Sequence, residues 1–128
     1  ALKVEGIDNL FCAGEKAGLL VGHTEAIVTG TLAGYNSIKF CKEEELLEIP
    51  TELAIGEAIA YVREQMRTEE GLSKKYTFSG SVLFDRMKSL GLYSTDIERI
   101  NNKIDKLGLK NIFSYSEEAD KLKVKLKN

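Results

Sequence analysis

Three glycines spaced four residues apart, Gly14, Gly18 and Gly22, constrain the first third of the chain more than any other feature. The apolar run that precedes them is short, which favours a buried strand over residues 4–13 rather than a helix. A pattern with helical periodicity follows over residues 23–40. The order of strand, glycine loop and helix predicts half of a βα unit.

The segment over residues 23–40 carries small side chains along one face. They recur at helical spacing: Ala26, Gly30, Ala33 and Ser37. A glycine inside a helix costs about 1 kcal/mol relative to alanine. Gly30 and Gly34 therefore need a compensating reason, and we expect this helix to lie very close to another backbone.

Three further helices and two strands are predicted in the rest of the chain. Apolar residues at helical spacing place the helices over residues 51–66, 81–90 and 95–107. The strands cover residues 112–115 and 121–127, and the second alternates lysine with apolar residues. The predicted fold class is therefore α+β and mainly helical, with a βα segment, a small helical subdomain and a C-terminal two-stranded element.

Capping signals accompany these helices. Thr51 follows the single proline and is the expected N-cap of the helix over residues 51–66. Thr95 and Glu98 have the spacing of a capping box. Gly91 stands where glycine commonly ends a helix.

Charge divides the chain near residue 70. Residues 1–70 hold 6 basic and 13 acidic side chains, a net charge of −7, whereas residues 71–128 hold 12 and 7, a net charge of +5. Such blocks indicate two subdomains that attract each other, or a basic half that faces an anionic partner such as RNA. We place the domain boundary there, with domains over residues 1–70 and 71–128.

The glycine loop also has a chemical meaning. A helix that opens near Gly22 points free backbone N–H groups and the positive end of its dipole at whatever lies beyond the end of the strand. Such a site suits an anion or a polarised carbonyl, and glycine lets a ligand approach without meeting a Cβ. Ordinary βα turns use glycine too, so a ligand site and a structural turn both remain open on physical grounds.

Three stretches of this region carry a resemblance. Residues 10–18, 22–26 and 30–36 together resemble the late FAD-binding segment of the glucose-inhibited division protein A family, which includes the tRNA-modifying flavoproteins GidA (MnmG) and TrmFO. The resemblance covers about residues 6–40. A looser similarity to the TrmFO branch follows over residues 50–56.

The resemblance implies a role for specific residues beside FAD. Those that it places there are Ala13, Gly14, Glu15, Gly22, His23, Thr24 and Glu25. Two of them depart from the family pattern, since Glu15 stands where glutamine is usual and His23 stands where tyrosine is common. The βα segment would then complete a flavin-binding domain, and the protein would act as an FAD-dependent oxidoreductase or methyltransferase in tRNA uridine modification.

One motif of the family is missing from the chain. FAD binding in such proteins also depends on a G-x-G-x-x-G turn that holds the pyrophosphate, and no such turn occurs here. We therefore expect a C-terminal fragment of a larger flavoprotein. Its partner would be the N-terminal remainder, and alone it would be inactive and retain FAD poorly.

The basic half supports an alternative. Two helices followed by a hairpin have the outline of a winged-helix unit, so the chain could instead be a non-enzymatic nucleic-acid-binding or interaction module. The residues that would contact RNA are Arg99, Lys103, Lys106, Lys121, Lys123 and Lys125. Lysines on an edge strand also prevent aggregation, so a purely structural role stays open.

No constellation typical of a catalytic or metal site emerges. The chain has two cysteines, Cys12 and Cys41, and one histidine, which excludes a Cys/His zinc site of the usual spacing. No apolar run approaches the roughly 18–20 residues that cross a bilayer, and no signal peptide is recognisable. We expect a cytoplasmic protein without a membrane partner, and homo-oligomerisation remains open.

Overall fold

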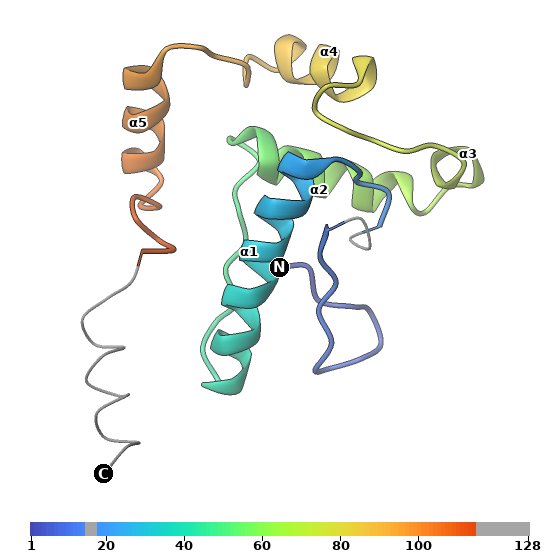
Figure 1. Ribbon diagram of the computed structural model, residues 1–128, viewed down its shortest axis with the longest axis vertical. Coiled ribbons are helices and arrows are strands. Elements are labelled where there is room, and N and C mark those ends of the chain that lie inside the picture. Colours follow the sequence, from blue (N-terminus) through green and yellow to red (C-terminus); the bar gives the residue numbers. More distant parts are fainter. Residues whose placement is uncertain (15–17, 115–128) are drawn as a thin grey trace. The chain divides into compact units, whose positions relative to one another are not determined.

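The computed structural model of the chain describes residues 1–14 and 18–114 (Figure 1). Two compact units divide the chain, Ala1–Asp96 and Ile97–Asn128. The helices of the described residues are α1 (His23–Cys41), α2 (Ala54–Gln65), α3 (Glu69–Leu72), α4 (Ser81–Ser89) and α5 (Ile97–Lys106). The predicted mainly helical character is confirmed, and the change of charge near residue 70 lies inside the first unit.

The predicted strand over residues 4–13 is not formed. The chain folds back on itself there, with an isolated antiparallel bridge between Lys3 and Phe11 and a hydrogen bond of 2.9 Å from the Val4 amide to the Leu10 carbonyl (Figure 1). Leu10 is 45% exposed. A strand is stable only within a sheet, and the described residues supply no second strand for one.

The predicted C-terminal strands are not confirmed either. Residues 112–114 lie in turns, and the Ser114 amide donates to the Asn111 carbonyl oxygen. The rest of the predicted two-stranded element, including residues 121–127, lies outside the described residues.

Helix α1 confirms the helix predicted over residues 23–40, and its buried face is partly polar. The buried side chains are Glu25, Thr29, Leu32, Ala33 and Asn36. Asn36 is fully buried and joins α1 to the chain on both sides: its Nδ2 donates to the carbonyl oxygens of Ala1 and Leu47, and its Oδ1 accepts from the Leu47 amide. The hydrogen bonds of Asn36 therefore tie this face to the segments at Ala1 and Leu47, beside the packing of Leu32 and Ala33.

The close backbone approach that Gly30 and Gly34 suggested is absent from the described residues. A Cβ added at either position would meet no atom within 4 Å. The close approach is found in α2, where a Cβ on Gly56 would overlap the Pro50 carbonyl oxygen. The chain turns tightly before α2, with the Leu53 amide donating to that same carbonyl, and only glycine leaves room for it.

The predicted N-cap of α2 is wrong. The helix begins at Ala54 and its N-cap is Leu53, without a side-chain hydrogen bond, because residues 50–53 form the turn just described. The prediction that glycine ends α4 is confirmed. Gly91, which follows the C-terminus of α4, has a φ of 67°, in the left-handed region.

The core of the first unit joins segments from both sides of residue 70. It consists of buried apolar side chains: Leu19, Leu20, Ala58, Val62, Tyr76 and Leu83. Leu20 and Tyr76 form an isolated parallel bridge, with the Val21 amide donating to the Tyr76 carbonyl oxygen at 2.9 Å. The segment after the glycine loop is thereby fixed against α2 and α4, which places the start of α1 beside α4.

Candidate functional site

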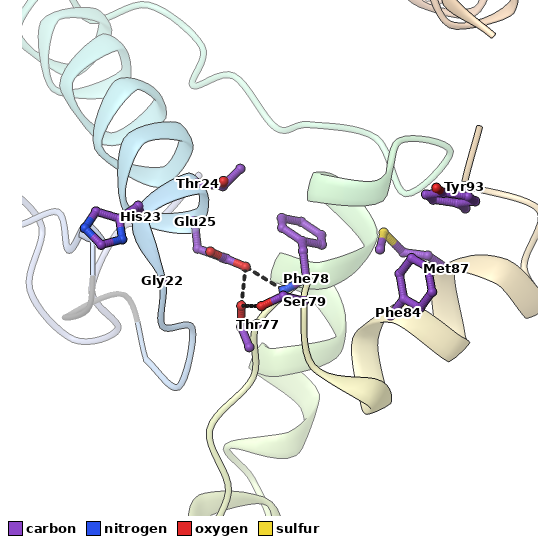
Figure 2. A pocket seen from close by; sticks show the side chains of 10 residues that line it. All are labelled: Gly22, His23, Thr24, Glu25, Thr77, Phe78, Ser79, Phe84, Met87 and Tyr93. Atoms are coloured by element: carbon purple, nitrogen blue, oxygen red, sulfur yellow. Dashed lines mark hydrogen bonds between the residues drawn. The ribbon is translucent and has the colours of Figure 1, made fainter. Parts of the chain in front are cut away.

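A hollow of about 510 Å³ lies where the start of α1 faces α4 and the segment before it (Figure 2). All of its lining belongs to the first unit. The lining residues are Gly22, His23, Thr24, Glu25, Thr77, Phe78, Ser79, Phe84, Met87 and Tyr93. The hollow is open to the surface, and its walls carry both aromatic and polar side chains.

The first wall of the hollow is the N-terminus of α1. Gly22 is the N-cap of the helix, with a φ of 115°, and within residues 1–14 and 18–114 no side-chain hydrogen bond caps the helix start. Within α1, the first backbone amide that has a hydrogen-bond partner among the described residues is that of Ala26. It donates to the Gly22 carbonyl oxygen at 3.0 Å. The amides of His23, Thr24 and Glu25 are therefore donors that a carbonyl or an anion in the hollow can use.

The Glu25 side chain joins the start of α1 to the segment before α4. It is 3% exposed, and its carboxylate accepts hydrogen bonds from the Thr77 hydroxyl and from the Phe78 backbone amide (Figure 2). The carboxylate thus fixes the segment over residues 77–79 against α1. Because it also brings a negative charge to the hollow, the free amides beside it suit a neutral polarised carbonyl better than a phosphate.

Gly14 and Ala13 do not line the hollow. The Gly14 amide donates to the Thr29 hydroxyl at 2.9 Å, and that hydroxyl donates to the Glu25 carbonyl oxygen at 2.7 Å. Ala13 is partly buried. The structure therefore brings together Gly22 and the three residues that follow it, while Glu15 lies outside the described residues.

His23 contributes its backbone to the hollow more than its ring. Figure 2 shows the imidazole pointing away from Glu25 and Phe78, on the other side of the helix start. The side chain is exposed. The hydrogen-bond donor that this position offers to the hollow is its amide.

Sequence reasoning missed the second wall, which comes from residues 77–93. Phe78, Phe84 and Tyr93, together called the aromatic wall below, lie across the hollow from α1 (Figure 2). The rings of Phe84 and Tyr93 pack edge to face with centroids 5.2 Å apart. The apolar periodicity that predicts the helix over residues 81–90 gives no indication that Phe84 lines a hollow.

The predicted RNA-contacting residues fall in two groups. Arg99, Lys103 and Lys106 lie on α5, in the second unit, and no side chain of this helix is buried among the described residues. Ile97, the first residue of α5, is 72% exposed. Lys121, Lys123 and Lys125 lie outside the described residues, so the winged-helix interpretation stays a prediction.

Residues 1–14 and 18–114 contain neither a metal cluster nor a membrane-spanning helix. No group of three or more histidine, cysteine or acidic side chains there could hold a metal ion. No helix within the same residues is long and apolar enough to cross a membrane. Cys12 and Cys41 are both free thiols.

Comparison with known proteins agrees with the N-terminal resemblance. The family model of glucose inhibited division protein A matches residues 1–45, which include the whole of α1. A methylenetetrahydrofolate-tRNA-(uracil-5-)-methyltransferase TrmFO from Bacillus pumilus is 33% identical over 96 residues, which is 75% of this chain. The enzyme of the same name from Listeria monocytogenes is 40% identical over 55 residues, 43% of this chain.

These relatives are much longer than the chain. The matches span 19% of the Bacillus pumilus protein and 12% of the Listeria monocytogenes protein. No solved structure matches the chain. Residues 1–45 match the glucose inhibited division protein A family, and the similarity to these TrmFO proteins agrees with that match, as the resemblance predicted.

Proposed function

We propose that this chain supplies one wall of the FAD site in a tRNA-modifying flavoprotein. The observation that carries the proposal is the start of α1, where three amides without a partner among the described residues line a hollow and follow a glycine with positive φ. This helix lies entirely within the segment that matches the family model.

The residues present fit a flavin ring better than a pyrophosphate. The amides of His23, Thr24 and Glu25 would donate to a ring carbonyl oxygen, and the buried Glu25 carboxylate would disfavour a phosphate at the same place. FAD, when bound, would supply redox chemistry. The chain itself would orient the ring and exclude water from one side of it. The resemblance also places Ala13, Gly14 and Glu15 beside the flavin, but Ala13 and Gly14 do not line this hollow and Glu15 lies outside the described residues.

The activity of the whole protein is part of the same proposal. The relatives are named as tRNA uracil-5-methyltransferases that use methylenetetrahydrofolate, and the chain matches less than a fifth of their length. We propose that the complete flavoprotein modifies uridine in tRNA in the cytoplasm. Its partners would be the rest of the flavoprotein polypeptide and tRNA, and the oxidoreductase or methyltransferase chemistry would need both.

A chimera tests the FAD wall directly. The matching region of the Bacillus pumilus enzyme is replaced by the aligned residues of this chain, and the purified chimera is examined for bound flavin by its yellow absorbance. We expect the chimera to hold FAD. A folded chimera that stays colourless after addition of FAD would overturn the proposal.

A matched pair of variants at one position sharpens the test. His23→Pro removes the first amide donor of α1, at a position where a helix tolerates proline. His23→Ala removes the imidazole and keeps the amide. We expect His23→Pro to weaken FAD binding about fivefold, the value of one hydrogen bond, and His23→Ala to leave it unchanged.

A further inference from the structure

One side of α1 is open to the surface along the helix and carries no charged group. Its residues recur at helical spacing, on the side opposite the buried side chains of this helix. Ile27 is 70% exposed and Ile38 is 62% exposed. The Thr31 hydroxyl donates to the Ile27 carbonyl oxygen at 2.8 Å, so it needs no partner outside the helix. The residues of this side, called the uncharged face below, are Ile27, Gly30, Thr31, Gly34, Ile38 and Cys41.

Other exposed helix surfaces of the same unit carry charges. On α4, Asp85 and Lys88 form an ion pair of 3.0 Å at the surface. The two charged residues of α1 are used elsewhere, since Glu25 is buried and Lys39 Nζ binds the Glu44 carboxylate at 3.2 Å. The water-facing side of a helix is normally charged or polar, and a continuous exposed apolar surface marks an interaction site.

The centre of the uncharged face is made of two glycines. Glycine destabilises a helix interior relative to alanine, and a Cβ at Gly30 or Gly34 would meet nothing within 4 Å among the described residues. No contact of the described residues therefore accounts for glycine at these positions. A second backbone that approaches α1 from outside them does, because glycine allows a closer approach than any other residue.

The length of the relatives indicates what covers this face. Residues 1–45, which contain all of α1, match the family model, and more than four-fifths of each of the two TrmFO proteins lies outside the match. The face also adjoins the hollow, because His23 lines the hollow one turn before Ile27. A polypeptide that covers the face would reach the edge of the proposed flavin site. Residues from outside this chain would be needed there, since the chain lacks the G-x-G-x-x-G turn.

We propose that the uncharged face of α1 docks the remainder of the flavoprotein polypeptide, through a helix or strand with small, uncharged side chains. This inference rests on the proposed function for the existence of that remainder. The two backbones approach most closely at Gly30 and Gly34, and Ile27 and Ile38 become buried on either side of them. The partner surface is uncharged too, because a charge buried against this face would find no partner on it.

A leucine at Gly34 tests the contact, because its effect should have opposite signs in two proteins. In the 128-residue chain the new side chain has open space, so Gly34→Leu should raise the melting temperature or leave it unchanged. In the chimera with the Bacillus pumilus enzyme, the same leucine would force the two backbones apart. We expect the melting temperature of the chimera to fall by about 3 °C or more.

Ala60→Leu is the matched control. Ala60 is a small, exposed helical residue of α2, so the substitution adds similar bulk away from the uncharged face. We expect it to change the melting temperature of either protein by less than about 2 °C.

Thiol labelling measures the burial of the face directly. Thr31 is exposed and lies between the two glycines, and Thr31→Cys is a small change. The new thiol should react rapidly with a maleimide in the 128-residue chain and at least tenfold more slowly in the folded chimera. Mass spectrometry distinguishes its label from labels on Cys12 and Cys41.

The proposal is overturned if Gly34→Leu affects the two proteins alike, or if Thr31→Cys reacts equally fast in both. Self-association of the 128-residue chain that Gly34→Leu abolishes, seen by sedimentation, would assign the face to a second copy and also overturn it. A chimera that does not fold would count against both proposals. A folded, colourless chimera with a protected Thr31→Cys would remove only the flavin contact, and a yellow chimera with a reactive Thr31→Cys would remove only the docking surface.

Discussion

The guanidinium of Arg86, on α4, binds the carboxylate of Glu57, on α2, with two nitrogens: Nε lies 2.8 Å and Nη2 lies 2.7 Å from the same oxygen. Arg86 also lies over the ring of Tyr61, with its Cζ 4.3 Å from the ring centroid. The hydrogen bond that Arg86 donates to Glu57 raises the pKa of Arg86, and Glu57 is buried. This pair fixes α4, and with it part of the aromatic wall, to α2.

Replacing Arg86 by leucine should destabilise the first unit. The Glu57 carboxylate would stay buried without its partner, so we expect Arg86→Leu to lower the free energy of unfolding by about 2–3 kcal/mol. Urea denaturation measures the loss. Lys88→Leu, which breaks an exposed pair with Asp85 on the same helix, should cost at most about 0.5 kcal/mol. If Glu57→Leu and Arg86→Leu combine additively in the double variant, the two side chains are not coupled and the prediction fails.

Gly22→Ala should destabilise the chain far more than a glycine substitution inside α1. Gly22 has a φ of 115°, and an added Cβ would overlap the Glu25 carboxylate. We expect a loss of about 2 kcal/mol or more, because both the backbone conformation and the Glu25 contacts are disturbed. The melting temperature and the urea midpoint measure it.

Gly30→Ala is the matched control for this substitution. Gly30 is helical, and a Cβ there would meet nothing within 4 Å. Alanine should therefore stabilise the helix by up to about 1 kcal/mol. Equal effects of the two substitutions would show that the positive φ and the Glu25 contact do not matter.

The elements that depend on local pattern were predictable from the sequence. The helix over residues 23–40 was found from its periodicity, and the end of α4 from Gly91, because both signals lie within a few residues of the structure they specify. The N-cap of α2 was predicted at Thr51 but lies two residues later, at Leu53, because residues 50–53 form a turn that precedes the helix.

Long-range relationships were not predictable from the same patterns. Glu25 binds Phe78, which lies 53 positions along the chain, and nothing near Glu25 in the sequence indicates that partner. The aromatic wall arises only when α4 is placed beside the start of α1. The glycine that permits a close backbone approach is Gly56, whereas the small-residue pattern had pointed to Gly30 and Gly34.

Tyr76→Phe should stabilise the protein, most of all at alkaline pH. Tyr76 is 2% exposed, and its hydroxyl has no hydrogen-bond partner among the described residues. Removing the hydroxyl should raise the free energy of unfolding by up to about 1 kcal/mol near neutral pH.

The alkaline part of this prediction follows from the pKa. Burial raises the pKa of Tyr76 above its ordinary value of 10.0. The unfolded chain ionises first, so the stability that depends on the neutral phenol is complete below about pH 10 and is lost as the pH rises further. The free energy of unfolding, measured with urea at about pH 8 and about pH 11, should fall less between the two pH values for Tyr76→Phe than for the parent chain. Tyr93→Phe, at a half-exposed position, should change stability by less than about 0.5 kcal/mol at the lower pH.

Asn36→Asp should destabilise the chain in a way that depends on pH. The Asn36 Nδ2 group donates to the carbonyl oxygens of Leu47, at 2.9 Å, and Ala1, at 3.1 Å. An aspartate would place a buried carboxylate oxygen against those two carbonyls, with an expected loss of about 3 kcal/mol at neutral pH.

Acid should partly restore the Asn36→Asp variant, because a protonated carboxyl can again donate to a carbonyl oxygen. Burial and the facing carbonyls would raise the pKa of the new carboxyl in the folded chain, so the variant should be most stable, relative to the parent chain, below the ordinary aspartate pKa of about 4, and should lose stability as the pH rises.

Ser37→Ala, which removes a hydroxyl that donates to the Ala33 carbonyl within α1, should change stability by about 0.5 kcal/mol at any pH. Urea unfolding at acidic and neutral pH measures both variants. An Asn36→Asp protein as stable as the parent at neutral pH would show that the contacts of Asn36 with Leu47 and Ala1 do not hold α1 in place.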